Sequence, residues 1–428
     1  MELAILLGAL VLFLAIGVPV AFALLGATLL AFFILDIPAM VAIQRVASGM
    51  SVFSLMAIPF FIFAGELMHR ARIAERIVHI AEAAFGRARG GLGQVDVGAS
   101  MLFGAVSGSA VASVSALGST LMPMMKKRGY DPDYAVNVTS TASVVGLLIP
   151  PSHNMIIYAA AAGVGVSIGE LFVAGIIPGI VTGGMLMLAA WLVAVKRGYP
   201  KGSFPGWPAF LKAFIEAFPG LMTAVIIVGG ILGGFFTATE SSAIAVIYTI
   251  IVGAVVYRSL NFKAFMEATL AAVRTTGMVL FIIGAASAFG WILAILETPG
   301  QLAGMITAIT DNPILILLII NLILLALGTF MDMSPLIVIT TPIFLPMAVE
   351  LGIDPVHFGI IMMLNLGIGL VTPPVGSVLF VGAAVGGMKM EDTVKTIWPF
   401  YGALIVALFM ITYLPFLSMG LVELMRGG

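Results

Sequence analysis

The chain has 428 residues, of which 61% are hydrophobic and only 9% are charged. Because a soluble domain carries about 25% charged residues, these proportions indicate a membrane protein with many spans. A formal net charge of −1 argues against nucleic acid as a partner, and the lack of cysteine excludes disulfides and thiolate metal sites.

The first predicted elements are two helices separated by a short break. The apolar run 3–35 is too long for one upright span, so we divide it near Gly17-Val18-Pro19. Glu2 follows Met1 without a basic segment, so we expect a retained span rather than a signal peptide. The next elements are predicted to be an interfacial amphipathic helix, a third span and a basic surface helix, at residues 38–50, 51–68 and 70–90.

A re-entrant hairpin and a broken helix follow. Residues 92–125 form two short apolar pieces around Ser107-Gly108-Ser109. A piece of about 15 residues extends roughly 22 Å, which is too short to cross a core of about 30 Å. The span 134–165 is interrupted by Pro150-Pro151, because each proline removes an amide donor and clashes with the preceding turn. The first half is completed by a span at 169–195 and a basic linker at 196–213.

The second half is predicted to repeat this order. Its hairpin at about 313–349 turns near Gly328–Ser334, and its broken helix covers 357–387. The remaining elements are spans at 217–236, 240–257, 276–296 and 397–417 and an amphipathic stretch at 260–274.

An internal repeat relates the two halves. Shifting the chain by 223 residues aligns 123–165 with 346–388 without a gap. The matching positions are mostly proline and glycine, which specify backbone shape rather than general hydrophobicity. They include Pro123/Pro346, Gly129/Gly352, Asp131/Asp354, Pro132/Pro355, Gly146/Gly369, Pro150/Pro373, Pro151/Pro374 and Gly163/Gly386.

The distribution of Lys and Arg predicts the orientation. With an external N-terminus, every Lys and Arg except Arg45 and Arg426 falls in the cytoplasm. Five crossings in each half then make the two repeats inverted. We expect an all-α polytopic protein with repeats at 1–195 and 214–428, and with both termini in the periplasm.

The first candidate site lies between the tip Ser107-Gly108-Ser109 and the break Gly146–Ser152. Unwound backbone exposes carbonyl groups, and nearby hydroxyls add further oxygens. Oxygen-only cages of this kind suit a hard cation such as Na⁺. The alternative is that these small residues only allow helices to approach closely. The repeat favours ion or substrate contact.

The second candidate site lies between Gly328–Ser334 and the break Gly369–Val375. Asp332 is an ionisable group in an apolar region, where carboxylates are costly and usually functional. The alternative is an aspartate that caps the second helix of the hairpin. The candidate substrate contacts at the two tips and after the first break are Ser107, Ser109, Asn154, Asp332 and Ser334.

No nucleotide-binding or hydrolase motif is present. The phosphate-binding loop Gly-x-x-x-x-Gly-Lys-Ser/Thr does not occur, so this chain is not expected to hydrolyse ATP or to be an enzyme. Transport would then require an ion gradient or another subunit.

The chain resembles the large membrane subunit of the tripartite ATP-independent periplasmic (TRAP) transporters over essentially its whole length. The resemblance rests on Leu102–Ala110, Ile149–Ser152, Ala174–Gly179, Gly352–Gly359 and Thr372–Gly376. It implies an elevator mechanism in the inner membrane, in which a transport domain with both hairpins slides against a scaffold. It also implies uptake of a small organic acid with Na⁺, such as a C4-dicarboxylate, a keto acid or a sialic-acid-like carboxylate.

The resemblance also implies partners and sodium ligands. The partners are a small four-helix membrane subunit, expected here as a separate chain, and a periplasmic substrate-binding protein. Thr372 stands where the first break has Ile149, so only the second break offers a hydroxyl there, and we expect unequal sites. The implied ligands are Ser107, Ser109, Gly146, Ile149 and Ser152 for one site, and Gly328, Gly369, Thr372 and Val375 for the other.

Two alternatives remain open at this point. One is a stand-alone sodium/divalent-anion symporter with the same inverted-hairpin plan, which would transport without partners. The other is a structural subunit of an ion-pumping complex, which predicts a chain of buried charged residues across several spans. The sequence contains too few such residues for the second alternative.

Overall fold

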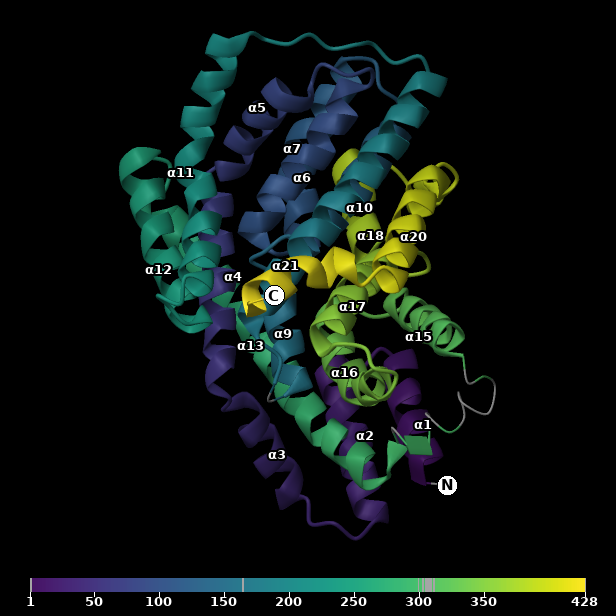
Figure 1. Cartoon of the computed structure of the whole chain (residues 1–428). Coiled ribbons are helices and arrows are strands. Elements are labelled where there is room, and N and C mark those ends of the chain that lie inside the picture. The colour runs from purple at the N-terminus through teal and green to yellow at the C-terminus, as the bar shows by residue number, and fades with distance from the viewer. Residues whose placement is uncertain are drawn as a thin grey trace.

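The computed structural model describes residues 2–163, 165–298, 300, 301, 304, 310 and 312–427 (Figure 1). Within these ranges every regular element is a helix, and the only strand-like pairing is an isolated bridge between Arg89 and Lys201. The predicted all-α architecture is confirmed for the described chain.

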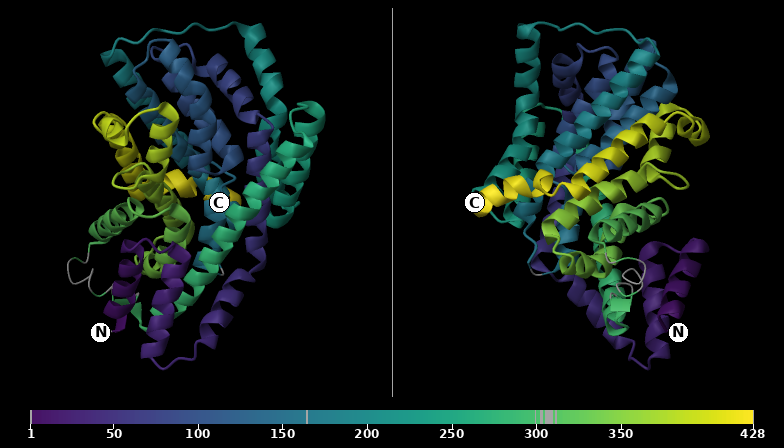
Figure 2. Two further views of the ribbon diagram at one scale, coloured as in Figure 1. Left: turned by 180° about the vertical axis from the view of Figure 1, so that it is seen from behind. Right: turned by 45° about the vertical axis from the view of Figure 1, so that its right-hand side comes forward.

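The N-terminal part packs on one long helix. Its helices are α1 (Glu2–Ala15), α2 (Val20–Ile34), α3 (Met40–Met50) and α4 (Ala57–Arg70). The predicted division near Gly17-Val18-Pro19 is confirmed by the gap between α1 and α2. Three of these helices, α2, α3 and α4, pack against α13 (Phe262–Ile295), which runs beside them in both views of Figure 2.

Two helical hairpins and two broken helices form the centre. The first hairpin consists of α6 (Gly91–Ser107) and α7 (Ala110–Lys127), and the second of α15 (Pro313–Gly328) and α16 (Met333–Glu350). The first broken helix is α8 (Pro132–Ser143) with a 3-10 turn Val144–Leu147, followed by α9 (His153–Ala162). The second is α17 (Pro355–Leu370) followed by α18 (Ser377–Gly386). Both helix pairs and both breaks lie at the predicted places, and re-entry of the pairs into the membrane stays a prediction.

The helix bounds follow the offset of 223. Pro132 begins α8 and Pro355 begins α17, while the 3-10 turn ends at Leu147 and α17 at Leu370. Proline suits a first helical position because its missing amide would have no partner there. The Pro150-Pro151 and Pro373-Pro374 bonds are both cis. Repeated proline positions thus place the same helix starts and breaks in both halves.

The remaining helices surround this centre. Helix α5 buries Ile73, Ile77 and Ile80 against α6 and α11, as its helical spacing predicts. Helix α20 continues, after a bend of 44°, as α21, which packs on α10 and α17. The helices are α5 (Ile73–Phe85), α10 (Ile168–Lys196), α11 (Trp207–Leu232), α12 (Ala238–Ile251), α19 (Met390–Val394), α20 (Trp398–Tyr413) and α21 (Phe416–Arg426).

Some predicted boundaries differ from the structure. The stretch 260–274 and the span 276–296 form one helix, α13, so their separation is wrong. No proline interrupts the segment. A single glycine, here Gly277, weakens a helix but does not end it, so the helix continues. Helix α11 begins at Trp207, so residues 197–206, rather than 196–213, connect α10 to α11.

Several helices have the length and composition of membrane spans. Five described helices pass this test alone, and the bent pair α20–α21 would add a sixth. The five are α10, α11, α13, α16 and the continuous helix Ala238–Val256. This last helix is α12 together with the π-helical turn Val252–Val256.

Candidate transport site

The first hairpin touches the first helix break through paired glycines. A Cβ on Gly104 would lie 2.1 Å from the Cα of Gly146, so α6 and the 3-10 turn meet backbone to backbone. At the tip, Gly108 has a φ of 60°, which suits glycine. A Cβ there would lie 3.2 Å from the carbonyl oxygen of Pro151. The tip therefore lies directly against the unwound segment.

The second hairpin meets the second break in the same way. A Cβ on Gly369 would lie 2.5 Å from the carbonyl carbon of Gly328. The amide of Val375 donates a hydrogen bond to the carbonyl oxygen of Thr329 at 3.2 Å, which ties this break to its hairpin. Tip and break are thus adjacent in both halves, as the sequence predicts.

Hydroxyl groups of the first tip hold its shape. The Ser109 hydroxyl caps α7 by accepting from the amide of Ala112 at 3.3 Å. Ser107 and Ser113 hydroxyls lie 3.1 Å apart. In the facing break Ser152 is fully buried, and its hydroxyl has no hydrogen-bond partner in the described structure. A buried hydroxyl without a partner is costly, so Ser152 offers an oxygen for a bound ion.

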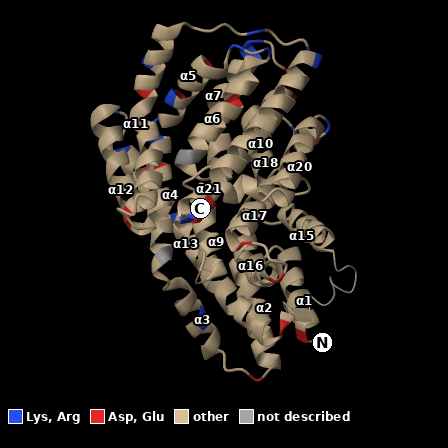
Figure 3. Ribbon diagram, in the orientation of Figure 1, with Lys and Arg blue, Asp and Glu red and all other residues tan. Residues whose placement is uncertain are grey.

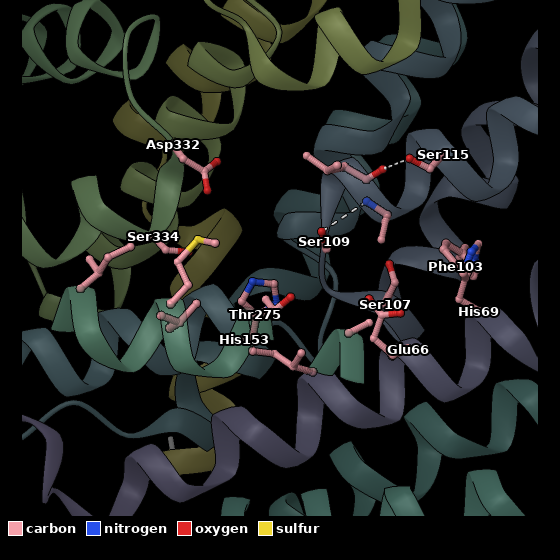
Figure 4. Close-up of a pocket in the computed structure, with 18 of the residues that line it drawn as sticks. Glu66, His69, Phe103, Ser107, Ser109, Ser115, His153, Thr275, Asp332 and Ser334 are labelled. Carbon is pink, nitrogen blue, oxygen red and sulfur yellow. Dashed lines mark hydrogen bonds between the residues drawn. The ribbon is translucent and has the colours of Figure 1, made fainter. Parts of the chain in front are cut away.

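Both hairpin tips line a single cavity of about 550 Å³. Figure 4 shows Asp332 and Ser334 on one side of it, with Ser107, Ser109 and Ser115 on the other. This volume lies within the range of about 300–1,000 Å³ that is typical of small-molecule sites. Four of the five predicted substrate contacts, Ser107, Ser109, Asp332 and Ser334, are therefore brought together here.

Asp332 presents its carboxylate to the cavity. It stands at the N-cap position of α16, but its side chain makes no capping hydrogen bond. The carboxylate faces the cavity and also interacts with the backbone amide of Met333, so the alternative that Asp332 caps this helix stays a prediction. Its direct contact with a substrate or ion stays a prediction.

Asn154 has a different place from the other predicted substrate contacts. It is buried, and its side-chain carbonyl oxygen accepts a hydrogen bond from the Ser334 hydroxyl at 3.2 Å. It joins α9, after the first break, to the second hairpin rather than lining the cavity. Asn154 therefore connects the two halves of the candidate site.

Three residues at the predicted sodium sites, Thr372, Val375 and Ile149, differ in the atoms that they could offer an ion. The Thr372 hydroxyl donates to the carbonyl oxygen of Ile368 at 2.7 Å, leaving its lone pairs available. Val375 has a hydrocarbon side chain, so only its backbone could coordinate an ion. Ile149 packs against Gly179, where a Cβ would lie 2.6 Å from it, and it too can contribute only backbone.

Sequence reasoning missed the part of the cavity lining that comes from helices α4 and α13. Helix α4 contributes Glu66, His69 and Arg70, and α13 contributes Thr275. The spacing of Glu66, His69 and Arg70 on one helical face could have indicated a shared surface. Arg70 pairs with Glu267 of α13 at 2.6 Å.

Two hairpins that meet two broken helices around one cavity, in an all-helical apolar chain, define a membrane transporter. The model of the tripartite ATP-independent periplasmic transporter, DctM component, matches residues 7–417. The chain belongs to this family, and it is a multi-pass permease component of a three-part transporter rather than an enzyme.

Relatives agree with this assignment, and a solved structure shares the fold. The chain is 39% identical to the sialic acid TRAP transporter large permease protein SiaM of Vibrio cholerae, covering 96% of each protein. It is 39% identical to the isethionate TRAP transporter permease protein DctMQ of Oleidesulfovibrio alaskensis, covering 97% of this chain and 66% of that one. The structure of the Alcanivorax borkumensis YdaH transporter matches with a TM-score of 0.61 at 15% identity over 88% of both chains, which indicates a shared fold.

Proposed function

We propose that this chain is the large membrane subunit of a sodium-coupled importer of a small organic acid that depends on a binding protein. The observation that carries the proposal is the convergence of two hairpin tips, each packed on its own helix break, at one cavity. Sialic acid and isethionate, the compounds in the names of two relatives, are small organic acids. C4-dicarboxylates, keto acids and sialic-acid-like carboxylates are the substrate classes we favour.

Sodium is the proposed coupling ion because the groups at each tip and break are oxygens. Na⁺ is a hard cation that prefers such ligands, and unwound backbone supplies them without a charged side chain. One ion would be held by Ser107, Ser109, Gly146, Ile149 and Ser152. The other would be held by Gly328, Gly369, Thr372 and Val375. The unpaired Ser152 hydroxyl supports the first of these assignments.

The proposed mechanism is an elevator motion of inverted repeats in the inner membrane. The repeat offset of 223 supports duplication, and the distribution of Lys and Arg supports periplasmic termini. The hairpins and broken helices would form the moving transport domain. Helices α4 and α13, which also line the cavity, would belong to the scaffold.

The proposed partners are a small membrane subunit and a periplasmic binding protein. This chain matches 66% of the length of the relative named DctMQ. The rest of that protein is long enough to hold a fused second component. The binding protein would deliver the organic acid to the cavity.

Reconstitution tests the coupling and the partners together. The chain is placed in liposomes with its small subunit, and uptake of a labelled organic acid is measured with the binding protein outside. We expect uptake that requires an inward Na⁺ gradient and disappears when K⁺ replaces Na⁺. Uptake that is unchanged without Na⁺ would contradict the coupling. Uptake by the chain alone would instead favour the stand-alone symporter.

A further inference from the structure

A basic cleft lies beside the linker, far from the hairpin tips. Its volume is about 910 Å³, and it opens between the segment after α5, the outer face of α10 and the linker. Figure 3 shows Lys and Arg gathered at this end of the molecule, where residues 197–206 join α10 to α11. The cleft lining consists of Ala84, Phe85, Arg87, Ala88, Arg89, Gln94, Trp191, Val195, Lys201 and Gly202.

Backbone contacts hold the walls of the cleft in place. Arg89 and Lys201 form a β-bridge, and the amide of Gly90 donates to the carbonyl oxygen of Pro200 at 3.1 Å. A Cβ on Gly202 would lie 1.9 Å from the carbonyl oxygen of Gly86, so the linker lies directly on this segment. The cleft is therefore built by ordered main chain rather than by a loose loop.

Three cations in the cleft have no acidic partner. Arg87, Arg89 and Lys201 are exposed, and none of them forms a salt bridge within the described residues. No lining residue is acidic. Nearby arginines differ, since Arg128 pairs with Glu82 at 2.7 Å and Arg197 pairs with Asp133 at 2.7 Å. The cleft thus presents concentrated, uncompensated positive charge.

The rest of the lining is apolar and continues along a membrane span. Trp191 and Val195 lie one turn apart on the same face of α10, and their side chains are 43% and 39% exposed. Phe85 also lines the cleft and is 38% exposed. A ligand that fits must therefore combine a negative head with a hydrocarbon part. Tryptophan at a membrane interface commonly has this environment.

We propose that this cleft binds an anionic phospholipid. The phosphate-bearing headgroup would contact Arg87, Arg89 and Lys201, and the acyl chains would lie along Trp191 and Val195 of α10. Basic pockets at the ends of membrane helices recognise such headgroups, and each Lys or Arg near the surface adds to the attraction. Because the cleft joins the linker to the segment before α6, the bound lipid would hold the linker against the base of the first hairpin.

Lipid binding to the purified membrane subunits tests the proposal. The probes are phosphatidylglycerol and phosphatidylcholine in detergent micelles, with binding measured by native mass spectrometry and by the shift in melting temperature. We expect phosphatidylglycerol to bind and stabilise, with an effect that weakens at high salt. Arg87→Gln/Arg89→Gln/Lys201→Gln should lower that affinity on the order of a hundredfold.

A matched control removes the same number of charges elsewhere. Lys127, Lys212 and Lys263 are exposed and have no salt bridge in the described structure, so Lys127→Gln/Lys212→Gln/Lys263→Gln should keep the affinity within about threefold of the parent. If both triple variants lost the same affinity for phosphatidylglycerol, the proposed site would be overturned. Binding would then depend only on the net charge of the protein. The melting temperature in phosphatidylcholine checks that the variants are folded.

Inorganic phosphate separates a lipid from a soluble anion. Millimolar phosphate should not displace phosphatidylglycerol, since it lacks the acyl chains that contact α10. Displacement at millimolar concentration, or equal binding of both lipids, would overturn the assignment to an anionic lipid.

Discussion

At the residue scale, the candidate site depends on glycines at which a side chain would clash and on a few hydroxyl and carbonyl oxygens. Gly104, Gly146, Gly328 and Gly369 bring each hairpin arm onto its helix break at backbone distance. Close approach matters because main-chain carbonyls at a break can reach an ion only if no side chain separates the two segments. These glycines and the hydroxyls near them give two predictions.

Gly369→Ala should damage the second tip. Its Cβ would lie 2.5 Å from the Gly328 carbonyl carbon, a backbone atom that cannot move alone. We expect a loss of about 1–3 kcal/mol in stability, as for other overpacked sites, together with loss of Na⁺-dependent uptake. Thermal unfolding and uptake measure the two effects.

Gly277→Ala is the matched control, because a Cβ on Gly277 in α13 would meet nothing within 4 Å. It should be neutral or stabilising, since alanine favours helix. Equal behaviour of the two variants would mean that contact between Gly328 and Gly369 is dispensable.

Thr372→Val should weaken Na⁺ activation more than it lowers expression. The substitution removes the one side-chain hydroxyl that the second break offers, so the Na⁺ concentration for half-maximal uptake should rise about tenfold, equivalent to about 1.4 kcal/mol. Uptake is titrated with Na⁺ at constant ionic strength.

The control for this prediction is Thr269→Val. The Thr269 hydroxyl in α13 donates to the Phe265 carbonyl oxygen at 2.9 Å, which is the same local bond that Thr372 makes to Ile368 at 2.7 Å. An unchanged Na⁺ dependence in Thr372→Val, as expected for Thr269→Val, would refute the assigned role.

At the scale of elements, the aspartate before each broken helix forms an ion pair with an arginine. In each half, this arginine comes from the end of that half of the chain. Asp131 precedes α8 and pairs with Arg197 after α10, at 3.0 Å. Asp354 precedes α17 and pairs with Arg426 at the end of α21, at 3.1 Å. The two aspartates are related by the offset of 223, so both halves use the same kind of anchor.

Arg197→Gln should destabilise the first broken helix. Arg197 binds both Asp131 and Asp133, and the side chains of Arg197 and Asp133 are only 25% and 17% exposed. Losing hydrogen bonds between charged groups at this depth should cost about 1.5–3 kcal/mol. Lys395→Gln breaks a pair whose side chains are 72% and 50% exposed, and it should leave the melting temperature close to that of the parent. Similar melting temperatures for the two variants would show that the Arg197 pairs contribute little.

At the scale of the whole molecule, the cavity lies between elements that the proposed mechanism assigns to different bodies. Its lining comes from both hairpin tips and from helices α4 and α13. Gly65 of α4 touches the first tip, since a Cβ there would lie 3.7 Å from the Cα of Ser107. An elevator motion would have to separate this pair.

Gly65→Cys/Ser107→Cys should therefore trap the transporter. The two backbones are in contact at this point, and the chain has no cysteine that could interfere with a cross-link. Oxidation should abolish uptake in liposomes, and reduction should restore it, while each single-cysteine variant should be insensitive to oxidant. Full uptake by the cross-linked protein would rule out movement of the first hairpin relative to α4.

The sequence by itself determined the hairpins, the helix breaks and their repetition. These depend on local rules, because proline and glycine restrict the backbone wherever they occur, and the 223-residue offset places them twice. It also identified Ser107, Ser109, Asp332 and Ser334, which the structure brings to one cavity.

Only the tertiary structure decided what faces those tips. Glu66, His69 and Arg70 are ordinary residues near a helix end until α4 packs beside the first hairpin. The bond from Ser334 to Asn154 joins residues 180 positions apart. Contacts of this kind depend on how helices from both halves pack, and neither hydrophobic periodicity nor turn residues encode that choice of neighbour.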